Sequence, residues 1–329
     1  SLLTLANSKI VSQKAVEHFR RKFRTNPIGT GAFALDSWTH NKAITLKANQ
    51  DYFKKGIPKV KSIQINRAKS QEEIATQFRE KKLNMVYLDW EAWQKADLGI
   101  IKEDSGYFEN TLATCYLGFL KDSLSQSPFR NENKRIKLAY SIDYQGLIDS
   151  VLFDFAMLPK AGFIPPLLPS FREKNSKKLP TYFLNDSIKD EFKTIFFTLD
   201  VQKSDENIAR YLKKNWKKKD IYVKIRIHST EELQKLIKNK QTNCYLAHHR
   251  SKYAARTSFF RQIYPSQDSL FDSLYVQNLY SKSHLEQEEI SEKLEFMIRK
   301  KALVIPLFYE KIWFNTQPTS KGVEIQATN

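Results

Sequence analysis

The chain has 329 residues, which is long enough to bury a sizeable core and favours two domains. Its hydrophobic fraction of 41% and aromatic fraction of 13% exclude a disordered chain, and no stretch approaches the roughly 18 apolar residues of a membrane-crossing helix. The formal net charge is +18, but its lysines are spread from Lys9 to Lys321, with one dense run at 213–219. We therefore expect a solvated basic surface and consider nucleic acid an unlikely partner.

The first part of the chain alternates helices and strands. Ser12 and Ser70 are placed as N-caps of two helices, and Gly29 and Gly31 fit a tight turn with positive φ angles before a strand. The predicted elements are a helix at 12–23, strands at 33–38, 43–48 and 60–66, a helix at 71–82 and a strand at 83–88.

The second part continues this alternation. Asp143 is placed to cap a helix, and the prolines in 161–169 predict irregular backbone. The predicted elements are a strand at 112–120, helices within 133–153, a strand at 195–199, a helix at 204–214, a strand at 221–227, a helix at 230–238, a strand at 242–249, a helix at 286–301 and a strand at 303–309. Such alternation indicates an α/β architecture with a mixed sheet.

Three stretches carry a family resemblance. The string at 26–38, with Asn49 and 51–53 after it, resembles a signature NPVGTGPY…W…NPDYW. The string at 135–148 resembles R-x-A-L-x-x-A-I-D-R-x-x-I, and 303–309 resembles A-x-x-I-P-L-Y. These are patterns of the bacterial extracellular solute-binding proteins of family 5, which include the oligopeptide and dipeptide binders of ABC transporters.

The resemblance implies a two-lobed, periplasmic-binding-protein-like α/β fold with mixed sheets, of type II and the peptide-binder cluster. Residues 1–112 and 304–329 would build the first lobe, and residues 113–303 the second. Members of the family normally carry well over a hundred residues ahead of the Asn-Pro turn. We therefore expect a missing N-terminal segment of the same protein to be a partner of an incomplete first lobe.

No motif in the sequence indicates catalysis, so we expect neither an enzyme nor a cofactor. His248 and His249 are adjacent, and neighbours on a strand face opposite sides, so the two cannot share one metal ion. Cys115 and Cys244 are too few for a zinc site. They either form a disulfide or remain separate buried thiols.

The resemblance also points to a ligand site. In the family's peptide binders, an acidic side chain five residues before a "T-S-F" helix start pairs with the ligand's ammonium group. Thr257 begins that match here, and Lys252 holds the acidic position. A cationic cleft favours a carboxylate or phosphate, so we expect a peptide or small anionic ligand. The expected cleft residues are Tyr245, Ala247, His248, His249, Arg250, Lys252 and Tyr253.

A binding protein of this kind would deliver its ligand to the membrane permease of an ABC transporter, from the periplasm or, as a lipoprotein, from the outer face of the cell membrane. Two alternatives remain open. The chain could be the solute-sensing C-terminal module of a cytoplasmic transcription regulator, or a degenerate binding module with a structural role.

Overall fold

The computed structural model describes residues 11–68, 70–88, 106–120, 127–167, 194–251, 255–263 and 268–317. The chain divides into two compact units, Ser1–Asn84 with Lys95–Lys102, and Met85–Gln94 with Glu103–Asn329. None of the helices in the described ranges combines the length and the apolar composition needed to span a bilayer. The expected lobe boundaries remain a prediction.

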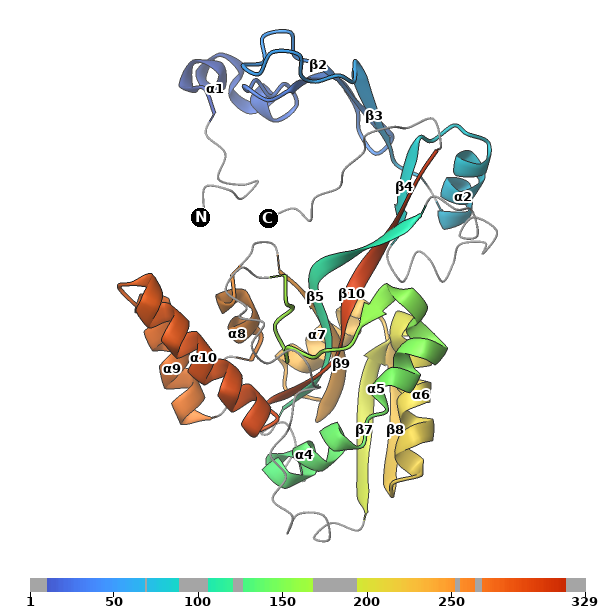
Figure 1. Ribbon diagram of the computed structural model, residues 1–329, viewed down its shortest axis with the longest axis vertical. Coiled ribbons are helices and arrows are strands. Elements are labelled where there is room, and N and C mark those ends of the chain that lie inside the picture. Colours follow the sequence, from blue (N-terminus) through green and yellow to red (C-terminus); the bar gives the residue numbers. More distant parts are fainter. Residues whose placement is uncertain are drawn as a thin grey trace. The chain divides into compact units, whose positions relative to one another are not determined.

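The first unit contains a three-stranded antiparallel sheet in the order β1-β2-β3 (Figure 1). Its elements are α1 (Gln13–Phe19), β1 (Phe33–Thr39), β2 (Ala43–Ala48), β3 (Ser62–Asn66) and α2 (Gln71–Arg79). Ser12 and Ser70 cap the two helices, accepting hydrogen bonds from the amides of Ala15 and Glu73. Both predicted caps are confirmed.

The glycine turn before β1 is held by Asn49, which follows the end of the neighbouring strand β2. The Asn49 amide Nδ2 donates to the carbonyl oxygen of Gly31 at 2.8 Å, and Asn49 Oδ1 accepts from the Asp51 amide at 3.1 Å. Neither Gly29 nor Gly31 has a positive φ, so that expectation was wrong. The left-handed residue near this sheet is Asn41, with φ 60, in the turn between β1 and β2.

The second unit is built on a mixed sheet that, among the described residues, has the order β4-β10-β5-β9-β7-β8, with β6 also paired to β10. β7 is parallel to both β8 and β9, whereas the remaining pairs are antiparallel. The strands are β4 (Met85–Leu88), β5 (Tyr107–Phe119), β6 (Ala156–Met157), β7 (Ile195–Gln202), β8 (Ile221–His228), β9 (Cys244–Arg250) and β10 (Val304–Thr316).

Helices cover both faces of this sheet. Because strand neighbours face opposite sides, Cys244 and Leu246 join a core with α4, α5 and α6, while Tyr245 joins a core with α8, α9 and α10. Figure 1 shows the first group beside β7 and β8 and the second group on the other side of the unit. The helices are α4 (Glu132–Tyr140), α5 (Tyr144–Leu147), α6 (Glu206–Lys217), α7 (Thr230–Lys238), α8 (Thr257–Ile263), α9 (Ser269–Tyr280) and α10 (His284–Lys300).

The proline-rich loop is irregular over 161–167, as predicted, and side chains of the sheet hold it in place. Tyr309 Oη donates to the Gly162 carbonyl at 2.9 Å and accepts from the Ala161 amide at 3.1 Å. Thr114 Oγ1 donates to the Phe163 carbonyl at 3.0 Å. The loop backbone is therefore satisfied by two strands instead of by regular structure.

The motif at 135–148 is explained by two side chains. Asp143 is the N-cap of α5, and its Oδ1 accepts from the Gly146 amide at 3.0 Å, so the predicted cap is confirmed. Arg135 is 2% exposed. Its guanidinium donates to the carbonyl oxygens of Phe129 at 2.7 Å, Lys301 at 2.7 Å and Ala302 at 3.0 Å. Arg135 thus joins α4 to the end of α10.

Replacing Arg135 with Met keeps the length of the side chain but leaves several buried carbonyl oxygens without a donor. We expect Arg135→Met to lower the free energy of unfolding by about 3 kcal/mol or more. Denaturant unfolding of the variant measures this loss. Lys293→Met, on the exposed face of α10, is the matched control and should change stability by no more than about 0.5 kcal/mol. Equal stability of the two variants would contradict the proposed bracing role.

Candidate functional site

Polar side chains gather where the three parallel strands end. β7, β8 and β9 run in the same direction and end at Gln202, His228 and Arg250. Ligands of open α/β sheets bind outside the carboxyl ends of parallel strands, where side chains from several strands converge. This edge, which also holds the expected ligand residues of β9, is the candidate binding site.

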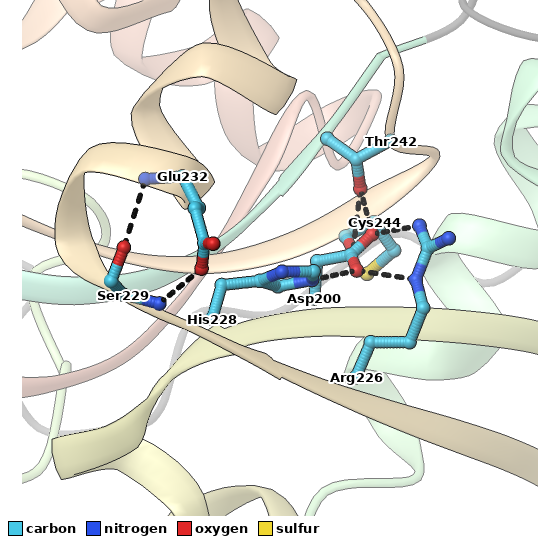
Figure 2. A network of polar contacts seen from close by, with 7 residues as sticks. All are labelled: Asp200, Arg226, His228, Ser229, Glu232, Thr242 and Cys244. Carbon is cyan, nitrogen blue, oxygen red and sulfur yellow. Dashed lines mark hydrogen bonds and ion pairs between the residues drawn. The ribbon is translucent and has the colours of Figure 1, made fainter.

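A buried carboxylate joins the three strands near this edge. Asp200 of β7 is fully buried and accepts hydrogen bonds from Arg226 Nε at 2.6 Å and Nη2 at 2.7 Å. His228 Nε2 lies 2.8 Å from Asp200 Oδ1, and Thr242 Oγ1 donates to Oδ2 at 2.6 Å. Figure 2 shows Asp200 between these three partners. Burial alone would raise the pKa of Asp200, but the hydrogen bonds from Arg226, Thr242 and His228 lower it.

A capping box follows this network directly. Ser229 Oγ accepts from the Glu232 amide at 3.2 Å, and Glu232 Oε2 accepts from the Ser229 amide at 2.9 Å (Figure 2). The start of α7 is therefore fixed one residue after His228. Ser229 is the N-cap of the helix that the sequence predicts at 230–238.

Four charged side chains form what we term the edge cluster: Asp205, His248, Arg250 and Glu310. His248 Nδ1 lies 2.7 Å from Glu310 Oε1, and His248 Nε2 lies 3.0 Å from Asp205 Oδ1. Arg250 Nη2 donates to Glu310 Oε2 at 2.9 Å. The cluster ties β9 to β10 and to the turn after β7, and its two carboxylates face two cations.

The pKa values follow from this pairing. Burial opposes a charge on His248, but Cys115 and the Asp205 carboxylate outweigh it and raise the pKa of His248 well above its ordinary value. Burial likewise would raise the pKa of Glu310, but hydrogen bonds and charges from His248 and Arg250 lower it to about 2. Both groups are therefore charged at neutral pH.

The opposite face of β9 carries the other expected residues. Tyr245 is buried against α8–α10, and Ala247 is half-buried against the same core. A Cβ atom at Gly118 of β5 would lie 2.2 Å from the Tyr245 ring, so only glycine permits this ring to cross β5. His249 Nε2 lies 3.5 Å from Ser258 Oγ, and burial lowers the pKa of His249 to about 4. His249 is thus neutral.

The expected site residues therefore divide between two faces. His248 and Arg250 lie on one, and Tyr245, Ala247 and His249 on the other, so the prediction that the two histidines face opposite sides of the strand is confirmed. Lys252 and Tyr253 lie outside the described residues. Whether any of the seven contacts a ligand remains a prediction.

Of the two arrangements expected for the cysteines, a disulfide or separate buried thiols, the structure has separate buried thiols. In the pairing of β5 with β9, Cys115 lies opposite His248 while Cys244 lies opposite Phe119. Four residues of extended strand separate the two positions by about 13 Å. This exceeds the roughly 7 Å between Cα atoms that a disulfide can bridge, so the suggested pairing does not hold.

Asp205, Glu310 and the network around Asp200 are not predicted from the sequence. Asp200 had a usable signal, because a lone carboxylate inside an apolar strand has to find a donor. Asp205 and Glu310 had none, since their partner His248 is 43 and 62 residues away.

The edge cluster is suited to stabilising the fold and binding a ligand, and not to proton transfer. Both nitrogens of His248 face carboxylates, so the ring has no nitrogen left to act as a base. In the described part of the chain, no three His, Cys, Asp or Glu residues are grouped so that they could hold a metal ion.

Replacing Glu310 with Gln removes the anion shared by His248 and Arg250. We expect Glu310→Gln to destabilise the fold by about 3 kcal/mol near pH 6, because two cations lose their counter-charge. Since the pKa of Glu310 is lowered in the folded state, its contribution is present above about pH 4.5 and is lost as the pH falls toward 2.

The stability difference between wild type and Glu310→Gln should therefore shrink between pH 4.5 and pH 2, as measured by urea unfolding. Glu289→Gln, at an exposed position of α10, is the control and should show no such dependence. A difference that stays constant down to pH 2 would contradict the pairing.

Known proteins resemble this chain over most of its length. The family model for bacterial extracellular solute-binding proteins, family 5, matches residues 1–271. The oligopeptide-binding protein OppA of Bacillus subtilis is 22% identical over 63% of this chain and 41% of its own length. The glutathione-binding protein GsiB of Salmonella paratyphi A is 23% identical over 50% of this chain and 31% of its own length.

Solved structures show the same fold. The ABC transporter substrate-binding protein CtaP of Listeria monocytogenes superposes with a TM-score of 0.76 at 17% identity, covering 93% of this chain and 66% of CtaP. The expected periplasmic-binding-protein-like fold is thereby confirmed. The chain spans less than half the length of OppA and GsiB. These relatives are solute-binding proteins, in agreement with the expectation that the chain is not an enzyme.

The motifs, the fold and the family match agree, and the chain belongs to family 5 of the bacterial extracellular solute-binding proteins.

Proposed function

We propose that this chain is part of the solute-binding protein of an ABC importer and that it binds a peptide or peptide-like ligand at the carboxyl edge of β7, β8 and β9. The observation that carries the proposal is the family match over residues 1–271, together with relatives named for binding an oligopeptide and glutathione. Peptides are recognised through backbone groups and a few charged side chains, and this edge supplies both.

The charge of the edge favours a ligand with a free carboxylate. The edge cluster is neutral, because two cations balance two anions. Arg250 is 54% exposed on its side chain and uses one nitrogen for Glu310, so its other donors remain for a carboxylate. Lys252 follows two residues later and adds a further positive charge at the position where the family's peptide binders have an acid.

A membrane permease is the expected partner, and the protein would meet it from the periplasm or the outer face of the cell membrane. The chain's relatives include an ABC transporter substrate-binding protein, which supports this assignment.

The ligand class can be tested by reversing one charge. The full-length protein is incubated with alanine peptides of two to five residues, each as the free acid and as the C-terminal amide, and bound species are measured by native mass spectrometry. We expect the free acids to be retained, and Lys252→Asp to weaken their binding by roughly tenfold or more, which corresponds to about 1.4 kcal/mol. Lys235→Asp, on the exposed side of α7, is the control.

The outcomes separate the parts of this proposal. Equal retention of acids and amides would exclude carboxylate recognition but leave a peptide-binding protein. Unchanged affinity in Lys252→Asp would exclude the role of this lysine. No retention of any peptide by the wild type would contradict peptide binding itself.

We further propose that an N-terminal segment of the same protein covers the first unit. Among the described residues of this unit, the only hydrophobic side chains that are buried are Ala15 and Phe78. In contrast, large apolar side chains are exposed: Val11, Val16, Ile28, Trp38, Phe53, Ile57, Val60 and Ile65. Burial of this surface would supply the hydrophobic free energy that the unit lacks.

Trp38 reports directly on such a cover. It is 42% exposed and lines a cavity of about 680 Å³ with Phe19 and Ile28. The fluorescence of Trp38 is obtained as the difference between wild type and Trp38→Phe, and its quenching by iodide is measured. We expect quenching in the 329-residue chain and protection in a protein that carries the additional N-terminal segment. Equal quenching in both would contradict the proposed cover.

A further inference from the structure

β8 forms one edge of the sheet of the second unit, and this edge carries an unusual set of side chains. β8 is the last strand of the sheet, and among the described residues it pairs on one side only, with β7. An edge strand presents a row of backbone donors and acceptors to any strand that can approach it. Phe196 and Tyr222 lie at the amino ends of β7 and β8, away from the candidate ligand site at the carboxyl ends.

Two neighbouring grooves lie along β8 and α6. One, of about 580 Å³, includes the side chains of Phe196 and Tyr222. The other, of about 450 Å³, includes Ile225 and Ile227. Tyr222 lies on one face of the strand and the two isoleucines on the other, because alternate residues of a strand face opposite sides. The apolar surface is therefore available on both faces of the same edge.

Lysines border both grooves. Three lysines line both grooves: Lys213 and Lys217 of α6 and Lys224 of β8. No carboxylate in the described part of the chain lines either groove. Among the described residues, none of these three ammonium groups has an ion-pair partner. Arg210 at the second groove differs, because Glu206 accepts from its Nε at 2.8 Å. The dense lysine run of the sequence thus contributes unpaired positive charge to one edge.

An exposed aromatic pair adds apolar area beside this charge. The rings of Phe196 and Tyr222 stack with centroids 5.1 Å apart and an interplanar angle of 18°. Phe196 is 69% exposed and Tyr222 is 39% exposed. Large aromatic side chains that remain in water beside unpaired cations are typical of interaction surfaces.

We propose that the β8 edge binds an acidic, extended polypeptide segment of a partner protein, which adds to the sheet as a further strand. Its backbone pairs with β8, and its side chains alternate between the two faces. Carboxylates meet Lys213, Lys217 and Lys224, and apolar side chains pack on the Phe196–Tyr222 pair and on the isoleucines. This function goes beyond the ligand binding proposed above.

A strand fits this edge better than a lipid surface does. Exposed apolar side chains lie on both faces of this strand, Tyr222 on one and Ile225 and Ile227 on the other, and a planar headgroup layer would contact one face. A strand reaches both, because its side-chain period is two residues. Anionic vesicles serve as the competing probe in the test of this proposal.

The test uses a fluorescein-labelled nine-residue peptide in which Glu and Val alternate, and the same peptide with Pro in place of Val. Binding to the full-length protein is followed by fluorescence anisotropy at low salt. We expect the Glu-Val peptide to bind and the Glu-Pro peptide, with equal charge, to bind at least tenfold more weakly, because proline cannot donate backbone hydrogen bonds.

Lys213→Glu/Lys217→Glu should weaken binding of the Glu-Val peptide by roughly tenfold or more. Lys235→Glu/Lys238→Glu, near the end of α7, makes the same change of net charge on another helix and should leave the affinity within about twofold. Thermal unfolding of both variants shows that each is folded before the affinities are compared.

Three results would overturn the proposal. The first is equal binding of the two peptides, which would indicate a general polyanion surface. The second is binding to phosphatidylglycerol vesicles that is lost in Lys213→Glu/Lys217→Glu, with no binding of the Glu-Val peptide. The third is no binding of either probe, in which case the lysines only keep the edge strand from aggregating.

Discussion

The pairing of β5 with β10 is the contact on which most of the second unit depends. The register runs from Val304 opposite Gly118 to Phe314 opposite Tyr107, so two long strands form the middle of the sheet. β10 also pairs with β4 and β6, and β5 pairs with β9. Removing this pair would leave the proline-rich loop, the edge cluster and both cores without a common support.

Several charged groups inside the second unit are paired with groups that lie far away in the sequence. Asp200 faces Arg226 of β8, whereas Glu310 and Asp205 both face His248 of β9. Arg135 donates to carbonyl oxygens. Burying such groups costs free energy unless each finds its partner in good geometry. They therefore specify which strand ends meet.

Much of the fold follows from local sequence. The caps at Ser12, Ser70 and Asp143 and the alternation of β8 each depend on a few neighbouring residues, and the structure has them as predicted. α9 was missed, because it has apolar residues on all sides and shows no amphipathic period. β5 and β10 run well beyond their predicted ends, since each is extended by the other.

The site was harder to predict for a physical reason. Sequence alternation places His248 and His249 on opposite faces, but it cannot say that Asp205 and Glu310 meet His248 or that Ser258 lies near His249. Those contacts depend on long-range strand pairing, which no local pattern encodes. The family resemblance supplied the fold, and the place of the ligand site remains a prediction.

The position of β10 also has a consequence for how the protein is made. This strand lies between β4 and β5, although it is one of the last elements in the chain. During synthesis the position between β4 and β5 cannot be filled until residues 304–316 leave the ribosome. A chain stopped before this point would expose the edges of β4 and β5. The sheet is therefore completed only after β10 has been synthesised, and products truncated before this strand are marked by unpaired strands that chaperones and proteases can recognise.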